Sequence, residues 1–250
     1  MTNPGSFIRD NRICVVVPTY NNGSTVADVV RRIQQLTDQV IVVIDGSTDD
    51  TRQQLESLQV ETVDYAQNQG KGHALLEGFK RAIQMGYEYA VTIDSDGQHY
   101  PEDIPLLCEA SEQWPDALVV GARRFDDPNM PGGNTFANRF SNFWFTLQTG
   151  IRLTDTQTGF RLYPLRHLKG MRFITSRYEA ELELLVYAAW GGVKVVEVPV
   201  RVYYPPQEER VSHFRPVADF MRITMLNTVL TTVAFVYGWP RKLLRSVMKS

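Results

Sequence analysis

The stretch Val91-Thr92-Ile93-Asp94-Ser95-Asp96-Gly97-Gln98-His99 is an apolar run that leads directly into two carboxylates, a glycine and an amide. Tyr89 to Ile93 is typical of a strand buried on both faces of a parallel sheet, and ligands of such sheets collect outside the carboxyl ends of the strands. Asp94 and Asp96 can both turn toward one point, where they repel each other unless a cation lies between them. The stretch therefore predicts a ligand site at a sheet edge.

A divalent cation that prefers oxygen ligands fits this pair. Mg2+ or Mn2+ takes carboxylate oxygens and commonly fills its other positions with substrate phosphates. We therefore predict that Asp94 and Asp96 hold Mg2+ or Mn2+, with Gln98 as a neutral third ligand. The alternative is a turn in which aspartate and glycine serve only the backbone geometry.

Earlier strand, loop and helix patterns extend this interpretation. The apolar runs 13–18, 40–44 and 60–63 are each followed by a polar loop and then by apolar residues at helical spacing. Such alternation predicts the α/β class, with a Rossmann-like, mostly parallel sheet flanked by helices. The loops after the strands should then converge at one edge.

Those loops carry groups suited to a nucleotide. Asp45 can accept hydrogen bonds from a base or ribose, and Lys71 would face phosphates. Gly46, Gly70 and Gly72 let backbone amides approach a ligand closely. Each loop alone is also a common turn signal, and 68–72 matches neither a dinucleotide nor a Walker fingerprint.

Composition limits the remaining functions. The chain has 250 residues, 43% of them hydrophobic, which suffices for one large domain or two small ones. A net charge of -2 argues against general nucleic-acid binding. Cys14 and Cys108 offer neither a disulfide framework nor metal-ligand spacing. Residues 1–10 show no secretory signal pattern, so we expect a cytoplasmic protein, or one on the cytoplasmic face of a membrane.

Several motifs together resemble family 2 glycosyltransferases. In order and spacing they match that family's nucleotide-sugar half: Val17-Pro18-Thr19-Tyr20-Asn21, Val43-Ile44-Asp45-Gly46-Ser47-Thr48-Asp49-Asp50-Thr51, Asn68-Gln69-Gly70-Lys71-Gly72 and Asp94-Ser95-Asp96-Gly97-Gln98-His99. The segments 121–124 and 155–161 resemble the branch of dolichol- and polyprenyl-phosphate mannose and glucose synthases. The resemblance covers residues 13–222 and departs at Ile44, where the family usually has an acid.

This resemblance implies the GT-A fold and an inverting transfer of a hexose from a UDP- or GDP-sugar to a lipid acceptor, foremost a polyprenyl phosphate. It implies a catalytic domain over 1–216, with a nucleotide-sugar half at 11–125 and an acceptor half at 126–216, followed by amphipathic helices over 217–250. The donor-binding residues that we expect are Pro18, Tyr20, Asn21, Asp45, Asn68, Gly70, Lys71 and Ser95.

The second half should bind the acceptor. The residues expected to carry the chemistry are Asp94, Asp96, Arg161 and Asp155, and those expected to bind an anionic acceptor are Arg123, Arg139, Ser141, Arg210 and Arg215. Arg139 and Ser141 are implied by the resemblance alone.

The acceptor decides whether a general base is needed. A lipid monophosphate, with a second pKa of about 6, is largely ionised at neutral pH and attacks unaided. A hydroxyl of a glycolipid, another lipid or a polysaccharide precursor needs a carboxylate within hydrogen-bond reach. Asp155, Glu179 and Glu181 are the candidates, and at most one of the two glutamates should face the site because residues two apart do not share a helix face.

The tail raises the question of a membrane. Residues 223–240 are free of charges over 18 residues, at the lower limit for a membrane-spanning helix. A polar stripe of Thr224, Asn227, Thr228 and Thr231 lies opposite Leu226, Leu230, Val233 and Val236, and the basic segment 241–249 follows. We predict a tail that lies on a membrane surface. Packing against its own domain is the alternative.

Two other function classes fit the sequence less well. A sugar nucleotidyltransferase shares the α/β sheet and the paired acids, but it has a basic, glycine-rich loop where this chain has Thr19-Tyr20-Asn21-Asn22. A binding module without activity does not need the intact Asp94 and Asp96.

Overall fold

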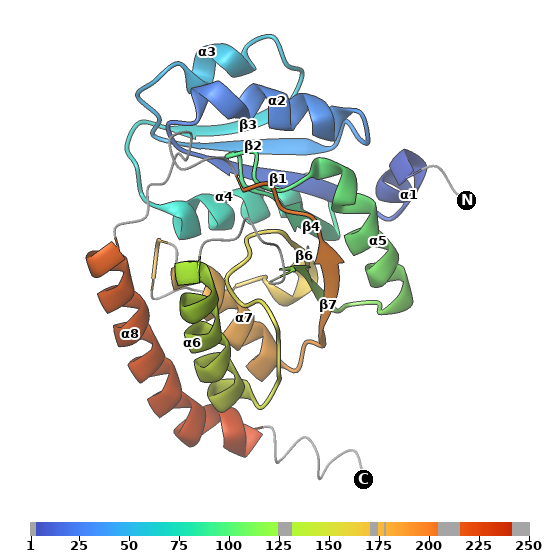
Figure 1. Cartoon of the computed structure of the whole chain (residues 1–250). Coiled ribbons are helices and arrows are strands. Elements are labelled where there is room, and N and C mark those ends of the chain that lie inside the picture. Colours follow the sequence, from blue (N-terminus) through green and yellow to red (C-terminus); the bar gives the residue numbers. More distant parts are fainter. Residues whose placement is uncertain (1–3, 125–131, 171–174, 178, 205–215, 242–250) are drawn as a thin grey trace.

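The structure is a computed structural model that describes residues 4–124, 132–170, 175–177, 179–204 and 216–241. Within these residues a seven-stranded sheet lies between layers of helices (Figure 1). Its strands are β1 Ile13–Thr19, β2 Val40–Asp45, β3 Glu61–Tyr65, β4 Tyr89–Thr92, β5 Leu118–Arg123, β6 Arg161–Pro164 and β7 Val195–Val200. Their spatial order is β3-β2-β1-β4-β6-β5-β7.

The predicted class, a mostly parallel sheet flanked by helices, is confirmed. Neighbours pair in parallel except around β6, which runs antiparallel to both β4 and β5. The sequence did not reveal β6, because its four residues follow the polar turn 155–160 and are too short to show a period. Pro199 lies in β7 at the sheet edge, where a residue without an N–H is tolerated.

Alternate residues of each central strand enter two different cores. Val15, Val17 and Val42 pack with α2 (Gly23–Gln34) and α5 (Ile104–Gln113), and α1 (Pro4–Asp10) and α3 (Thr51–Leu55) complete that side. Val16 and Val43 pack with α4 (Lys71–Gln84) and α7 (Glu179–Gly191) on the other. This double coverage explains why the strands read as continuous apolar runs.

Helix α4 lies unusually close to the sheet. A Cβ at Gly78 would be 2.5 Å from Cγ1 of Val16, so only glycine fits at this crossing. The helix begins at Lys71, directly after the loop 68–70. Close packing of α4 thereby fixes the position of Lys71 at the carboxyl edge of the strands. Short 3-10 turns at Pro101–Asp103 (η1) and Leu165–His167 (η2) complete the connections.

Two further helices extend the α7 side. Helix α6 (Gly132–Thr149) packs beside α8 (Pro216–Val233), which continues into a π-helical turn, η4 (Ala234–Gly238), and both contact α7 (Figure 1). Leu226 and Leu230 of α8 are buried in the core, and Asn227 Oδ1 accepts a hydrogen bond from Gln148 Nε2 at 3.1 Å. Among the residues that the structure describes, no helix is long and apolar enough to span the bilayer.

The division of α8 into faces differs from the expected polar and apolar stripes. Asn227, placed in the polar stripe, is buried beside Leu226 and Leu230, whereas Met221 and Met225 are exposed. The reason is the contact with α6, where Gln148 Nε2 donates to Oδ1 and to the backbone carbonyl of Asn227. The helix therefore turns an apolar stripe outward.

Candidate active site

The loops that follow β1, β2 and β4 meet at the carboxyl edge of the sheet, as predicted. Asn21 Oδ1 accepts hydrogen bonds from the backbone N–H of Thr48 at 2.8 Å, and Asn22 Nδ2 donates to Ser95 Oγ at 2.7 Å. Asn21 has φ of 52°, a left-handed conformation that asparagine tolerates better than most residues. These side chains fasten three loops to one another, and the sequence analysis did not single out Asn22.

Asp45, at the end of β2, holds the loop 68–70 in place. Its buried carboxylate accepts hydrogen bonds from the N–H of Gln69 at 2.7 Å, the N–H of Gly70 at 2.8 Å and Asn68 Nδ2 at 3.1 Å. Both oxygens accept hydrogen bonds from the chain itself, so Asp45 positions this loop. Its direct contact with a base or ribose stays a prediction.

Lys71 is the central cation of the site. Its Nζ lies 2.7 Å from Asp94 Oδ1 and 3.0 Å from Glu181 Oε2, and its side chain is only 16% exposed. Burial opposes the charged form, but the carboxylates of Asp94 and Glu181 outweigh it, and the pKa of Lys71 is raised. The sequence did not indicate that Lys71 pairs with Glu181, which lies in the first turn of α7.

Asp94 and Asp96 differ in their surroundings. Burial raises the pKa of Asp94, yet the nearby ammonium of Lys71 outweighs it and the net shift is downward. Burial and the charge of Asp94 raise the pKa of Asp96 to about 6. The N–H of Gln98, 2.9 Å from Asp96 Oδ1, partly offsets this rise in pKa. Asp96 is thus the carboxylate whose charge is least compensated.

The pair Asp94 and Asp96 is suited to a divalent cation whose coordination shell the phosphates of the donor would complete. No group of three His, Cys, Asp or Glu side chains that could hold a metal occurs in the described part of the chain. Mg2+ commonly binds to one or two protein carboxylates, while substrate phosphates and waters complete its coordination shell. The uncompensated charge of Asp96 beside Asp94 fits such an ion.

Gly159 closes the site from the side of β6. A Cβ at this position would lie 2.8 Å from Lys71 Nζ and 2.9 Å from both Asp94 Oδ2 and Glu181 Oε1. The carbonyl of Gly159 accepts a hydrogen bond from Thr92 Oγ1 at 2.6 Å, which holds the loop against β4. A methyl group at this position would push at least one of these side chains aside. In the sequence, the motif Thr158-Gly159-Phe160 was the signal that could have indicated this glycine.

Asp155 and Arg123 form a buried ion pair, and their predicted roles in the chemistry and in acceptor binding stay predictions. Arg123 Nε and Nη2 donate to the two Asp155 oxygens at 2.6 and 2.9 Å, and Asp155 is fully buried. Burial raises the pKa of Asp155, but the hydrogen bond from Arg123 prevails and the pKa is lowered. Such a carboxylate is a poor general base, and the Arg123 guanidinium is already committed.

Arg161 also bonds to the chain itself, and its predicted part in the chemistry stays a prediction. It is fully buried in β6, and its guanidinium donates to the backbone carbonyls of Glu181 at 2.7 Å and Thr156 at 2.9 Å. It therefore cannot contact an acceptor in this arrangement. Instead it ties the turn 155–160 to the first turn of α7, and so it positions Gly159 and Glu181.

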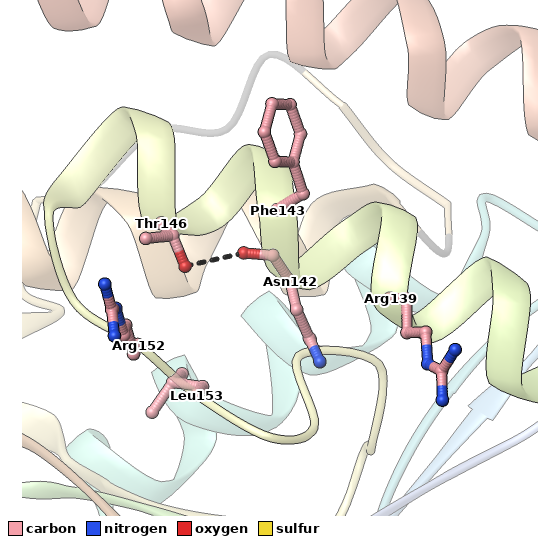
Figure 2. Close-up of a pocket in the computed structure, with 6 residues that line it drawn as sticks. All are labelled: Arg139, Asn142, Phe143, Thr146, Arg152 and Leu153. Carbon is pink, nitrogen blue, oxygen red and sulfur yellow. Dashed lines mark hydrogen bonds between the residues drawn. The ribbon is translucent and has the colours of Figure 1, made fainter.

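The other expected residues are dispersed. Pro18 and Ser95 are buried and Tyr20 is half-buried. Ser141 is buried and accepts a hydrogen bond from Thr156 Oγ1 at 2.7 Å, so it is not open to an acceptor. Arg139 lines a hollow beside α6, and none of the predicted donor-binding residues lines it (Figure 2). Arg210 and Arg215 lie outside the described residues.

Comparison with known proteins agrees with the motifs. The family model Glycosyl transferase family 2 matches residues 14–170. The UDP-N-acetylglucosamine--dolichyl-phosphate N-acetylglucosaminyltransferase of Methanococcus voltae is 30% identical over 220 residues, which cover 78% of this chain and 87% of the relative. The undecaprenyl-phosphate mannosyltransferase of Micrococcus luteus is 30% identical over 203 residues, covering 76% and 82%.

A solved structure shares the fold. Glucosyl-3-phosphoglycerate synthase from Mycobacterium tuberculosis, in complex with Mn2+, UDP-glucose and phosphoglyceric acid, has a TM-score of 0.68 and 22% identity, covering 92% of this chain and 82% of that chain. At this identity the likeness establishes the fold, which is the GT-A architecture. Together with the family match over more than half of the sequence, it leads to one assignment: the chain belongs to glycosyl transferase family 2.

Proposed function

We propose that this glycosyltransferase moves a hexose from a nucleoside diphosphate to the phosphate of a polyprenyl lipid, with inversion at the anomeric carbon. The names of its relatives support the acceptor class, since one acts on dolichyl phosphate and another on undecaprenyl phosphate. A phosphate oxygen of the acceptor forms the new bond to the anomeric carbon. The bond to the diphosphate oxygen breaks, and its electron pair leaves with the nucleoside diphosphate.

The donor side uses the converged loops. Asp94, Asp96 and Gln98 would hold Mg2+ or Mn2+, and such an ion, when bound, neutralises charge that grows on the departing diphosphate. Solved relatives contain Mn2+ or Mg2+ with UDP, which supports this choice. The loop 68–70 is held by Asp45, and Lys71 directly after it would face the diphosphate of the donor.

The observation that carries the acceptor assignment is that two of the three candidate bases are ion-paired, while the third, Glu179, is nearly buried and its Oε2 accepts no hydrogen bond in the described structure. Asp155 is ion-paired with Arg123, and Glu181 is ion-paired with Lys71. Glu179 is 6% exposed at the start of α7. A phosphate acceptor is already ionised near neutral pH and needs no base, so it fits this arrangement, whereas a hydroxyl acceptor requires a free carboxylate.

The reaction is tested with the purified protein, a panel of UDP- and GDP-sugars, and Mg2+ or Mn2+. We expect one donor to release its nucleoside diphosphate rapidly when undecaprenyl phosphate is added, with a hexosyl-phosphate lipid as the product. Glu179→Gln should turn over like the wild type. Transfer only to hydroxyl acceptors, with turnover abolished by Glu179→Gln, would contradict the proposal.

We also propose the setting of the reaction. A water-insoluble acceptor places the protein at a membrane surface, on the cytoplasmic face where nucleotide sugars are available. The division into a catalytic domain at 1–216 and membrane-associating helices at 217–250 remains a prediction.

A further inference from the structure

The loop 94–98, which carries the predicted cation ligands, is attached to the fold on both sides of Asp96. On the side before Asp96, Ser95 Oγ accepts a hydrogen bond from Asn22 Nδ2 at 2.7 Å. The backbone carbonyl of Ser95 accepts a second hydrogen bond, from Thr25 Oγ1 at 2.6 Å. Both donors belong to the start of α2. The first part of the loop is therefore fixed to the half of the chain that is expected to bind the donor.

The last part of the loop is attached to the second half of the chain. The backbone N–H of Tyr203 donates to the carbonyl of Gln98 at 2.8 Å, and His99 and Val202 form a single antiparallel β-bridge. Residues 201–203 follow directly after β7. This segment therefore runs alongside the end of the loop and holds Gln98 by its backbone.

Asp103 and Arg201 add a side-chain contact between the same two segments. Asp103 is 3% exposed, and its Oδ2 accepts a hydrogen bond from the backbone N–H of Arg201 at 2.7 Å. Its Oδ1 accepts two more, from Arg201 Nε at 2.9 Å and from Arg201 Nη2 at 2.6 Å. Hydrogen bonds between a guanidinium and a carboxylate are stronger and more directional than neutral ones. One buried carboxylate thus binds both the backbone and the side chain of Arg201.

The position of Asp103 in the chain shows that this contact replaces a local one. Asp103 is the N-cap residue of α5, where an aspartate usually accepts a hydrogen bond from a backbone N–H of the first turn. Its side chain makes no such cap hydrogen bond here. Instead, it binds a residue 98 positions further along the chain. The carboxylate therefore serves the contact with the segment 201–203 rather than the start of α5.

Tyr100 extends the contact toward the loop. The guanidinium carbon of Arg201 lies 5.0 Å from the centroid of the Tyr100 ring, and that of Arg32 lies 5.4 Å from it. Both distances are within the range of cation–π attraction. Arg32 in turn donates to both oxygens of Glu102, at 2.9 and 2.6 Å. Arg201 therefore contacts the chain that leaves the loop at two places, Tyr100 and Asp103.

We propose that Arg201, through its ion pair with Asp103, is a positioning residue that holds Asp96 and Gln98 in the geometry that the divalent cation requires. The inference rests on the proposed function, because it assumes the cation site of that proposal. Gly97, between the two ligands, has φ of 75° and open space where a Cβ would be, within the described part of the chain. The shape of the loop therefore depends on the attachments at its two ends. Mg2+ in particular demands a nearly ideal arrangement of its ligands.

The test is calorimetric titration of UDP and of GDP into the full-length protein, each with Mn2+ and with EDTA. In Arg201→Ala we expect the gain in nucleotide affinity from Mn2+ to fall about tenfold, because residues that orient metal ligands commonly contribute that much or more to metal affinity. The affinity with EDTA should equal that of the wild type. Arg201→Lys keeps the charge without the forked geometry, so it should recover part of the Mn2+ gain.

A second variant guards against a loss of folding, because Arg201→Ala removes the cation beside the buried Asp103. Arg201→Ala with Asp103→Asn leaves no charge of this pair behind. Its Mn2+ gain should match that of Arg201→Ala, since both changes remove one contact and their effects should not add. Arg81→Ala is the matched control. It breaks the ion pair with Glu61, at 2.8 Å, where β3 begins and thus at the opposite end of the strands, and it should keep the full Mn2+ gain.

The outcomes separate this inference from the proposed function. Circular dichroism confirms that each variant is folded. A wild-type Mn2+ gain that Arg201→Ala and the double variant both retain would overturn the role of Arg201 and leave the cation site intact. A loss of affinity that is equal with Mn2+ and with EDTA would also overturn it, because that loss would show a role in stability alone. No Mn2+ gain in the wild type would contradict the cation site itself, and this inference with it.

Discussion

The edge where the loops converge and the α6–α8 face, which is the solvent-exposed side of helices α6 and α8, differ in how they hold charge. At the edge, the charged groups Asp45, Lys71 and Asp155 are buried, and each is held by several partners at hydrogen-bond distance. On the face, apolar side chains are exposed and Arg139 and Arg152 border an open hollow. Charges in the first region are therefore held by the chain itself, whereas the second region leaves apolar and basic side chains open to solvent.

This contrast shows where stability and function are separated. A buried charge that loses its partner destabilises the fold strongly, because its desolvation is no longer compensated. An exposed residue that contacts nothing in the protein contributes little to the free energy of unfolding. Substitutions that break a buried ion pair at the edge should therefore lower stability, whereas substitutions of exposed side chains on α6 and α8 should leave it nearly unchanged.

The largest effect is expected from Asp96→Asn. Removing one charge from the cation site forfeits several kcal/mol of transition-state stabilisation, which corresponds to roughly a thousandfold loss in kcat/KM. Asp38→Asn is the matched control, since Asp38 is exposed in the turn before β2, at the opposite end of the strands. Steady-state rates with saturating Mg2+ test this. Equal rates for Asp96→Asn and the wild type would exclude a cation role for Asp96.

Asp155→Asn should cost about 3–5 kcal/mol of unfolding free energy at neutral pH, because it leaves Arg123 buried without its anion. Arg12→Ala, which breaks the exposed pair with Glu88, should cost less than about 1 kcal/mol. Urea unfolding of both variants makes the comparison.

The pH dependence of this difference follows from the lowered pKa of Asp155. Its contribution is fully present above the ordinary value of 3.8 and is lost as the pH falls through the lower folded-state pKa. The difference in unfolding free energy between the wild type and Asp155→Asn should therefore narrow as the pH falls below 3.8. A gap that stays constant down to the acid transition would argue against the ion pair.

Gly159→Ala should lower kcat about tenfold to a hundredfold, since the added methyl displaces Lys71, Asp94 or Glu181 and small misplacements in an active site are costly. Gly191→Ala is the control, because the nearest atom to its Cβ, Val193 Cγ2, is 4.0 Å away. Both variants should keep the thermal midpoint within a few degrees of the wild type. A fully active Gly159→Ala would show that the cluster observed around Lys71 is not the catalytic one.

The smallest effect is expected for Met225→Asp. Its side chain is 73% exposed, so unfolding free energy should change by no more than about 0.5 kcal/mol. Thermal unfolding without lipid measures this. A large destabilisation would mean that Met225 packs within the protein and that the contrast between the two regions is mistaken.

The sequence predicted the converging loops well for a physical reason. Continuous apolar runs alternating with helical patterns leave few topologies, and a parallel sheet forces the loops after β1, β2 and β4 to one edge. Asp94 and Asp96 could therefore be assigned to that edge from the chain alone. The same reasoning missed β6, because four residues carry no usable period.

The roles of individual charges were harder to predict. Residue type shows that Arg161 and Arg123 can bind anions, but not whether the nearest anion or carbonyl belongs to a ligand or to the chain. In the fold, Glu181 and Thr156 supply carbonyls to Arg161, and Asp155 meets Arg123 across 32 positions of sequence. Likewise, the side that α8 exposes depends on the position of Gln148 on α6, and the sequence of α8 alone does not indicate that position.

The central claim is that a divalent cation on Asp94 and Asp96 binds the diphosphate of the donor. Calorimetric titration of UDP and of GDP into the wild type and into Asp96→Asn, each with Mn2+ and with EDTA, tests it most directly. We predict that one nucleotide binds the wild type at least roughly tenfold more tightly with Mn2+, and that Asp96→Asn abolishes this gain. Binding that is equally tight with EDTA, or a full Mn2+ gain in Asp96→Asn, would contradict it.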